Sequence, residues 1–273
     1  MLKKNTLALK AADAAGLPEE YICQAESKGL NGICFTTHID LNPKRAIVDR
    51  WVRVDGLLRG YSAEFFERYV DTIRELAEKS DISVLLGFEF SYQPFFTDLI
   101  QDFIDKYSPD FTIGSLHCLD DVGFTAGNES YYPLRFFPPQ KFLESYAESM
   151  IEMSRSSIFN AIGHIDGYKK YACRHWNIDD KEAVEKKIFP QIFREFAQND
   201  TAFEINTASI RKGLKDFYPR RELLEMAMEH GVCISSIGSD AHRPQDVGFM
   251  FPEVKSLMAD IGISLKPLKL RVY

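Results

Sequence analysis

The stretch ISSIGSDAHRPQDVG, residues 234–248, places Asp240 and His242 two positions apart at the end of an apolar, β-rich run. Pro244 follows at once and prevents a regular element from continuing. A carboxylate and an imidazole at this spacing can bind a divalent metal ion or exchange a proton with a substrate. Either chemistry needs further polar partners, which must come from other parts of the chain.

Candidate partners stand at the ends of the other apolar runs. These runs finish on Thr37 with His38, on Glu89, on His117, on His164, and on Glu204 with Asn206. Four of the six histidines therefore occupy such ends, which random placement would rarely produce. Neutral imidazoles combined with carboxylates suit zinc, manganese or iron better than calcium or magnesium. A carboxylate that bridges two ions roughly 3.5–4 Å apart would let them clamp a phosphoester and generate hydroxide.

The elements that position these residues alternate along the chain. Apolar runs rich in Ile, Val, Phe and Thr predict buried strands at residues 31–38, 82–90, 110–117, 157–164, 201–207 and 232–240. Helical spacing predicts helices at residues 17–29, 62–80, 138–155, 179–199 and 219–231. This alternation predicts an α/β protein with a parallel sheet. A weak seventh strand candidate at residues 1–8 makes a barrel at least as suitable as an open sheet, and a barrel gathers the carboxyl ends of its strands at one mouth.

Composition excludes several classes of protein. The net charge of -7 and the isoelectric point near 5.5 argue against binding to nucleic acid or to an anionic membrane through bulk charge. Five cysteines without CxxC spacing predict a reduced, cytoplasmic protein with no disulfide framework. No apolar run approaches the roughly 18 residues of a membrane span. Because no linker is evident, we expect one domain over residues 1–273, and the sequence leaves its oligomeric state open.

These motifs together resemble the polymerase and histidinol phosphatase (PHP) superfamily, and specifically its histidinol-phosphate phosphatases. The similarity runs over nearly the whole chain, through GICFTTH, GFEFS, GSLHCL, GHIDGYKKY, FEINTASIRKG and GSDAHRPQDVG in the family's order. FEINT followed by RKG favours the histidinol phosphatase branch over the polymerase domains. The resemblance implies a distorted seven-stranded, TIM-like (β/α) barrel that holds up to three metal ions.

The resemblance also implies a role for each matching position. The implied metal ligands are Glu89, His117, His164, His38, Asp240, His242 and Asp13. Asp240 and His242 are the implied catalytic residues, and a hydroxide on the metals would attack phosphorus directly, without a phosphoenzyme. Arg211 matches an arginine that grips the substrate phosphate. Lys169 stands where the family usually has arginine. Lysine keeps the positive charge but lacks the bidentate geometry of arginine.

The chain departs from the family near its beginning. The family has a strand ending in His-x-His, and the aligned positions here are Asn5 and Leu7. Leucine cannot bind a metal, and an asparagine amide is a poor ligand for a soft divalent ion. A further family histidine aligns near Asp13, which could still bind. The first metal would therefore keep two of its ligands, and the second would keep its whole set. This distribution favours two bound ions of zinc, manganese or iron over three.

Two hypotheses of function follow. The first is a metal-dependent phosphomonoesterase that converts L-histidinol phosphate to L-histidinol and phosphate in histidine biosynthesis, with efficiency reduced by the loss of His-x-His. The alternative is a non-catalytic barrel that binds metal or a phosphorylated metabolite. A mis-assigned chain start is a third explanation, although the spacing to LPEEY fits without a gap. Under each hypothesis the partner is a small phosphorylated metabolite rather than nucleic acid or a membrane.

Overall fold

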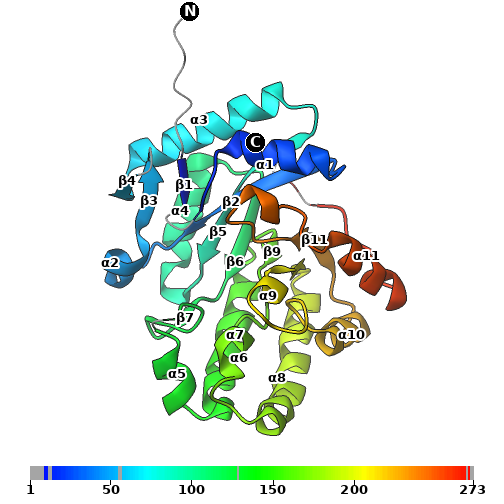
Figure 1. Ribbon diagram of the computed structural model, residues 1–273. Coiled ribbons are helices and arrows are strands. Elements are labelled where there is room, and N and C mark those ends of the chain that lie inside the picture. Colours follow the sequence, from blue (N-terminus) through cyan, green and yellow to red (C-terminus); the bar gives the residue numbers. More distant parts are fainter. Residues whose placement is uncertain (1–8, 12–13, 55–56, 128, 269, 271–273) are drawn as a thin grey trace, which may run out of the picture.

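The computed structural model describes residues 9–11, 14–54, 57–127, 129–268 and 270 of the chain. Within these residues, six parallel strands form the central sheet, in the order β11-β10-β9-β6-β5-β2. They are β2 (Gly32–Ile39), β5 (Ser83–Ser91), β6 (Phe111–Ser115), β9 (Ala161–Ile162), β10 (Phe203–Asn206) and β11 (Ile234–Gly238). All six were predicted, and the sheet curls into a half-barrel (Figure 1).

The predicted seven-stranded closure is not confirmed. Its first strand, at residues 1–8, lies outside the described residues. The described strand β1 (Leu9–Ala11) pairs antiparallel with β3 (Trp51–Val54) rather than with the central sheet. β4 (Leu57–Gly60) pairs with β3 in turn. A two-stranded ribbon, β7 (Cys118–Leu119) with β8 (Val122–Gly123), follows β6.

Helices cover the outer face of the curled sheet (Figure 1). The longer ones are α1 (Pro18–Ser27), α3 (Ala63–Lys79), α4 (Thr97–Tyr107), α6 (Pro139–Ser156), α8 (Ile178–Gln198), α10 (Arg221–Glu229) and α11 (Phe251–Asp260). The short ones are α2 (Ala46–Asp49), α5 (Tyr131–Phe136), α7 (Lys169–Ala172) and α9 (Ala208–Arg211). The five predicted helices appear as α1, α3, α6, α8 and α10, each within two residues of its predicted ends. Among the described helices, none has the length and apolarity that crossing a membrane requires.

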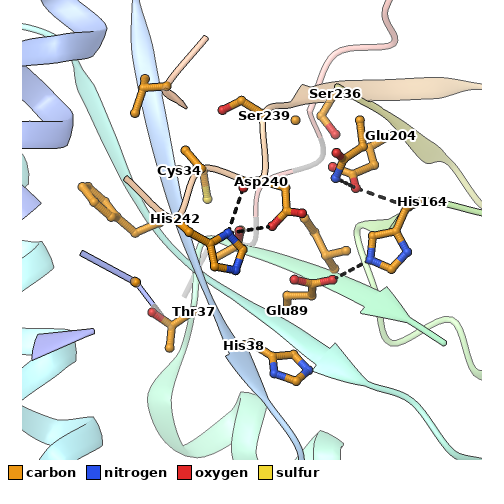
Figure 2. Close-up of a pocket in the computed structure, with 18 of the residues that line it drawn as sticks. Cys34, Thr37, His38, Glu89, His164, Glu204, Ser236, Ser239, Asp240 and His242 are labelled. Carbon is orange, nitrogen blue, oxygen red and sulfur yellow. Dashed lines mark hydrogen bonds and ion pairs between the residues drawn. The ribbon is translucent and has the colours of Figure 1, made fainter. Parts of the chain in front are cut away.

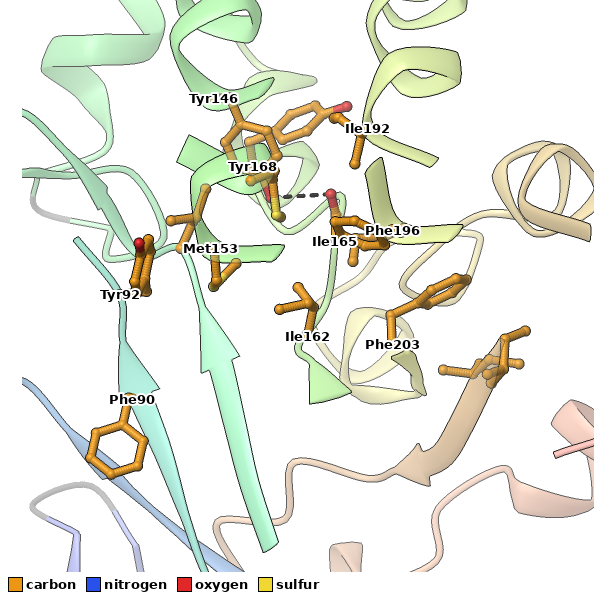
Figure 3. Packing of buried hydrophobic residues seen from close by; sticks show 14 of the residues in the cluster. Phe90, Tyr92, Tyr146, Met153, Ile162, Ile165, Tyr168, Ile192, Phe196 and Phe203 are labelled. Atoms are coloured by element: carbon orange, nitrogen blue, oxygen red, sulfur yellow. Dashed lines mark hydrogen bonds between the residues drawn. The ribbon is translucent and has the colours of Figure 1, made fainter. Parts of the chain in front are cut away.

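Aromatic packing between the sheet and the helices fixes the strands in place. On β5, Phe88 and Phe90 pack toward the helices, where Phe103 of α4 lies 5.2 Å and 5.6 Å from them, measured between ring centroids. At the other end of the sheet, Phe203 of β10 packs against α8, within the cluster shown in Figure 3. Because side chains alternate along a strand, residues next to these aromatics face the inside of the half-barrel. Glu89 is one of them.

Gly87 tests how tightly the central strands are packed. A methyl group there would lie 2.8 Å from Cys34 Sγ and 3.0 Å from the carbonyl oxygens of Phe35 and Phe111. We expect Gly87→Ala to lower the free energy of unfolding by about 1–3 kcal/mol, because the neighbouring backbone cannot retreat. Gly60→Ala is the control, since its nearest neighbour would be 3.9 Å away in an edge strand. Thermal denaturation that shows equal melting temperatures for both variants would contradict this expectation.

Candidate metal centre

Three strand ends bring a carboxylate and two imidazoles together. Glu89 lies in β5, while His117 and His164 follow the adjacent strands β6 and β9. Glu89 Oε1 is 3.1 Å from His164 Nε2 and 3.5 Å from His117 Nε2. Among the described residues, these three form the group whose ligand atoms all lie within 4.8 Å of one another. Figure 2 shows Glu89 and His164 pointing toward each other across the cavity.

The electrostatics of Glu89 favour a cation in this place. Burial acts to raise the pKa of Glu89, but hydrogen bonds with His117 and His164 hold it well below its usual range. The carboxylate is therefore ionised, and Ser115 Oγ donates a hydrogen bond to its Oε1 at 2.7 Å. A buried anion needs a compensating positive charge, which the imidazoles or a metal ion can provide.

The two imidazoles respond differently to this anion. Burial lowers the pKa of His117 to about 4, so its ring is neutral at neutral pH and has a lone pair for a metal. Burial also acts to lower the pKa of His164, but the hydrogen bond and charge of Glu89 raise it above the usual value. A divalent ion would replace the proton that Glu89 draws onto His164. One carboxylate and two imidazoles around an open cavity therefore fit a divalent ion of the zinc type.

His38 lies beside this group without belonging to it. In the pairing of β2 with β5, His38 is opposite Glu89. Its Nε2 is 3.2 Å from His117 Nδ1, and Ser91 Oγ lies 2.8 Å from both nitrogen atoms. His38 therefore contacts the three-residue group through the imidazole of His117 rather than through the carboxylate of Glu89.

Asp240 and His242 face the same cavity from the end of β11 (Figure 2). Asp240 has a left-handed backbone, with φ of 46°, and its Oδ2 lies 2.9 Å from Lys212 Nζ. His242 Nδ1 is 2.9 Å from the carbonyl oxygen of Asp240 and 3.4 Å from its Oδ1. These two residues therefore share the cavity with Glu89 but do not join the tight three-residue group.

The predicted phosphate-binding residues are engaged in contacts within the protein. Arg211 Nη2 donates to the carbonyl oxygens of Ser239 and Asp240, at 2.7 Å and 2.8 Å. Lys169 Nζ lies 2.9 Å from Asp166 Oδ2. Neither Arg211 nor Lys169 is among the described residues that line the cavity.

Their neighbours in the chain, Lys170 and Lys212, do line it. The cavity wall therefore carries two cationic side chains, each next in the chain to a predicted phosphate-binding residue. The remaining predicted ligand, Asp13, lies outside the described residues, as do Asn5 and Leu7.

The cavity also contains the carboxylate of Glu204, a strand-end candidate to which the family resemblance assigns no role. Glu204 in β10 is 4% exposed, and its Oε1 accepts hydrogen bonds from Asn206 Nδ2 at 2.9 Å and from His164 N at 3.3 Å. Burial raises the pKa of Glu204 to about 7. The position of Glu204 at the end of a predicted strand is the sequence feature that indicates a place in the site. The whole cavity has a volume of about 570 Å³, which suits a small metabolite.

The fold and this donor set define a class: an α/β half-barrel with a candidate metal centre at the carboxyl ends of its parallel strands. The chain belongs to the PHP domain family, which it matches over residues 8–208. The family resemblance drawn from the motifs is thereby confirmed.

Several relatives are named for one activity. The chain is 28% identical over 263 residues to a probable histidinol-phosphatase of Deinococcus radiodurans, covering 91% of this chain and 89% of the relative. It is 27% identical over 237 residues to the histidinol-phosphatase of Lactococcus lactis, covering 85% and 80%. The crystal structure of a Lactococcus lactis histidinol phosphate phosphatase, complexed with zinc, L-histidinol and phosphate, superposes with a TM-score of 0.71. That likeness covers 96% of this chain and 95% of the other at 21% identity, and it shows the fold.

The buried carboxyl of Glu204 makes stability depend on pH. Its pKa of about 7 in the folded state exceeds the usual value of a glutamate, so folding binds a proton and the folded state loses stability as pH rises toward 7. We expect Glu204→Gln to stabilise the metal-free protein at pH 8 by up to about 3 kcal/mol and to change little at pH 5. Denaturation at both values measures this, with the exposed Glu64→Gln as control. An equal effect at the two pH values would contradict the assignment.

Proposed function

We propose that this protein is a metal-dependent phosphomonoesterase that hydrolyses L-histidinol phosphate to L-histidinol and phosphate. The observation that carries the proposal is the cluster of Glu89, His117 and His164 at the wall of the cavity. The names of the relatives support the substrate, and the zinc, L-histidinol and phosphate of the Lactococcus lactis structure support the ligand chemistry.

The proposed division of labour follows from where the residues lie. Glu89, His117 and His164 would hold one ion, and Glu89 with Asp240 would hold a second. His38, His242 and Asp13 are proposed as ligands of a third ion, which has the least support from contacts among the described residues. A bound ion would supply positive charge against the phosphoryl oxygens and lower the pKa of a coordinated water.

The chain's own groups would bind the substrate and handle the proton. Asp240 faces the cavity, and we propose that it accepts the proton of the attacking water, with His242 beside it. Cationic side chains would meet the phosphate dianion. Lys212 and Lys170 line the cavity already, whereas Arg211 uses Nη2 for two carbonyl acceptors and has Nη1 without a hydrogen-bond partner among the described residues.

Arg211 and Lys169 remain proposed phosphate-binding residues on the strength of the resemblance. The single domain over residues 1–273 and the seven-stranded closure likewise remain proposals. A cytoplasmic location is also proposed, in keeping with five cysteines that are all free within the described ranges.

Removing one ligand tests the proposed function directly. We expect the wild-type protein to bind about two equivalents of zinc or manganese and to release phosphate from L-histidinol phosphate. His164→Ala should weaken zinc binding more than about 100-fold and abolish turnover, because the group of Glu89, His117 and His164 then loses one of its three ligands. The control is His175→Ala, a histidine exposed on a loop. Elemental analysis and a phosphate-release assay report both quantities.

The two hypotheses separate on the wild-type protein. Thermal stabilisation by L-histidinol phosphate without any phosphate release, with zinc, manganese or iron, would favour the non-catalytic alternative. The sequence feature behind that alternative is Asn5 and Leu7 in place of the family's two histidines.

Restoring those histidines gives a second test. If the rest of the centre is sound, the double variant Asn5→His/Leu7→His should bind more metal per chain and raise kcat by at least about tenfold, because two neutral ligands return to the ion proposed for Glu89 and Asp240. Metal content and initial rates measure the two effects, with Asn5→Gln/Leu7→Gln as the matched control. An unchanged rate despite added metal would show that Asn5 and Leu7 do not limit the activity.

A further inference from the structure

Ser91, at the end of β5, lies between two imidazoles. Its Oγ is 2.8 Å from His117 Nδ1 and 2.8 Å from His38 Nε2. The two rings meet edge to face, with centroids 4.7 Å apart. Ser91 is 5% exposed and lines the same cavity as Glu89. None of the roles proposed above uses this hydroxyl.

The strand geometry makes Ser91 a partner of Glu89. Residues two apart on a strand face the same side, so Glu89 and Ser91 both point into the half-barrel. Glu89 meets His117 at Nε2, 3.5 Å away, and Ser91 meets the same ring at Nδ1. A single strand therefore contacts both nitrogen atoms of one imidazole.

Only one tautomer of His117 then leaves Nε2 free to bind a metal ion beside Glu89. A neutral imidazole carries one N–H, and the nitrogen that binds a cation must be the other one. If Nε2 binds the cation beside Glu89, the proton lies on Nδ1 and is donated to Ser91 Oγ. The hydroxyl proton of Ser91 is then free to be donated to His38 Nε2. Each polar atom in this chain of contacts has a partner.

We propose that Ser91 is a positioning residue that holds His117 with its proton on Nδ1, leaves Nε2 free for a divalent ion, and links His38 to the same ring. The inference rests on the proposed metal site. It gives His38 a contact through Ser91, in addition to the ligand role implied by the resemblance. An oriented partner on the second nitrogen of a ligating histidine typically contributes about 10–100-fold to metal affinity.

The experiment compares Ser91→Ala, Ser91→Thr and Ser236→Ala. Ser236 lines the same cavity, and its Oγ has no hydrogen-bond partner among the described residues, so it controls for the loss of a cavity hydroxyl. We expect Ser91→Ala to weaken zinc binding about 10–100-fold in competition with a chromophoric chelator. Ser91→Thr, which keeps the hydroxyl, and Ser236→Ala should stay within about threefold of wild type.

A second readout does not depend on metal affinity. Nitrogen-15 NMR of the imidazoles reports which nitrogen of His117 carries the proton. In zinc-loaded wild type we expect it on Nδ1, and in the metal-free protein we expect Ser91→Ala, but not Ser236→Ala, to change the tautomer population. Unchanged zinc affinity in Ser91→Ala, or equal losses in Ser91→Ala and Ser236→Ala, would overturn the inference, as would an unaltered tautomer population. A wild type that binds no zinc but shows the tautomer change would contradict the proposed function and leave the role of Ser91 standing.

Discussion

The negative charge of Glu89 is the constraint on which the rest of this site depends. A largely buried carboxylate costs several kcal/mol unless charges and hydrogen bonds compensate it. Here Ser115, His117 and His164 provide those contacts. Each comes from β6 or from the segment after β6 or β9, the two strands that follow β5 in the sheet. The order of the strands, rather than any local motif, therefore determines that this anion has partners at all.

Glycines in two of the motifs leave room for polar groups of the cavity. In GHIDG, a methyl group on Gly163 would lie 2.2 Å from Ser115 Oγ. In GSDAH, a methyl group on Gly238 would lie 2.3 Å from Glu204 Oε2. Both glycines keep the strand ends close enough for the hydroxyl and the carboxylate to reach into the cavity. Aromatic side chains on the outer face hold the same strands, so the polar groups on the inner face have little freedom to separate.

The sequence predicted the parts of the structure that rest on long, regular patterns. Continuous apolar runs located the strands of the central sheet, and amphipathic spacing located five helices. The ribbon of β3 and β4 was missed because four-residue strands with exposed positions carry little periodicity. α4 and α11 were also missed, although both begin next to a proline-containing turn or first turn.

Within the site, the position of a residue at a strand end predicted its place in the cavity better than its side-chain type predicted its contacts. The strand-end histidines and carboxylates line one cavity, because parallel strands share one edge. The partners of Arg211 could not be read from the sequence, since its acceptors Ser239 and Asp240 lie on the turn after β11, far along the chain. Ser91 ends the motif GFEFS, but its residue type alone assigned it no role, which emerges only when Glu89 and Ser91 contact one imidazole.

The positions of the proposed ligands also bear on what Asn5 and Leu7 would change if they replace the family's histidines, as the resemblance implies. Glu89, His117 and His164 all come from the sheet and its loops, so this group does not depend on Asn5 or Leu7. The ion proposed for Glu89 and Asp240 would rely on the carboxylate of Asp240, which is already paired with Lys212 at 2.9 Å. An ammonium there neutralises Asp240 with one positive charge, whereas a divalent ion would bring two. If Asn5 and Leu7 replace the family's histidines as the resemblance implies, the departure would weaken the ion proposed for Glu89 and Asp240, whereas Glu89, His117 and His164 would keep the charge and geometry for a single ion.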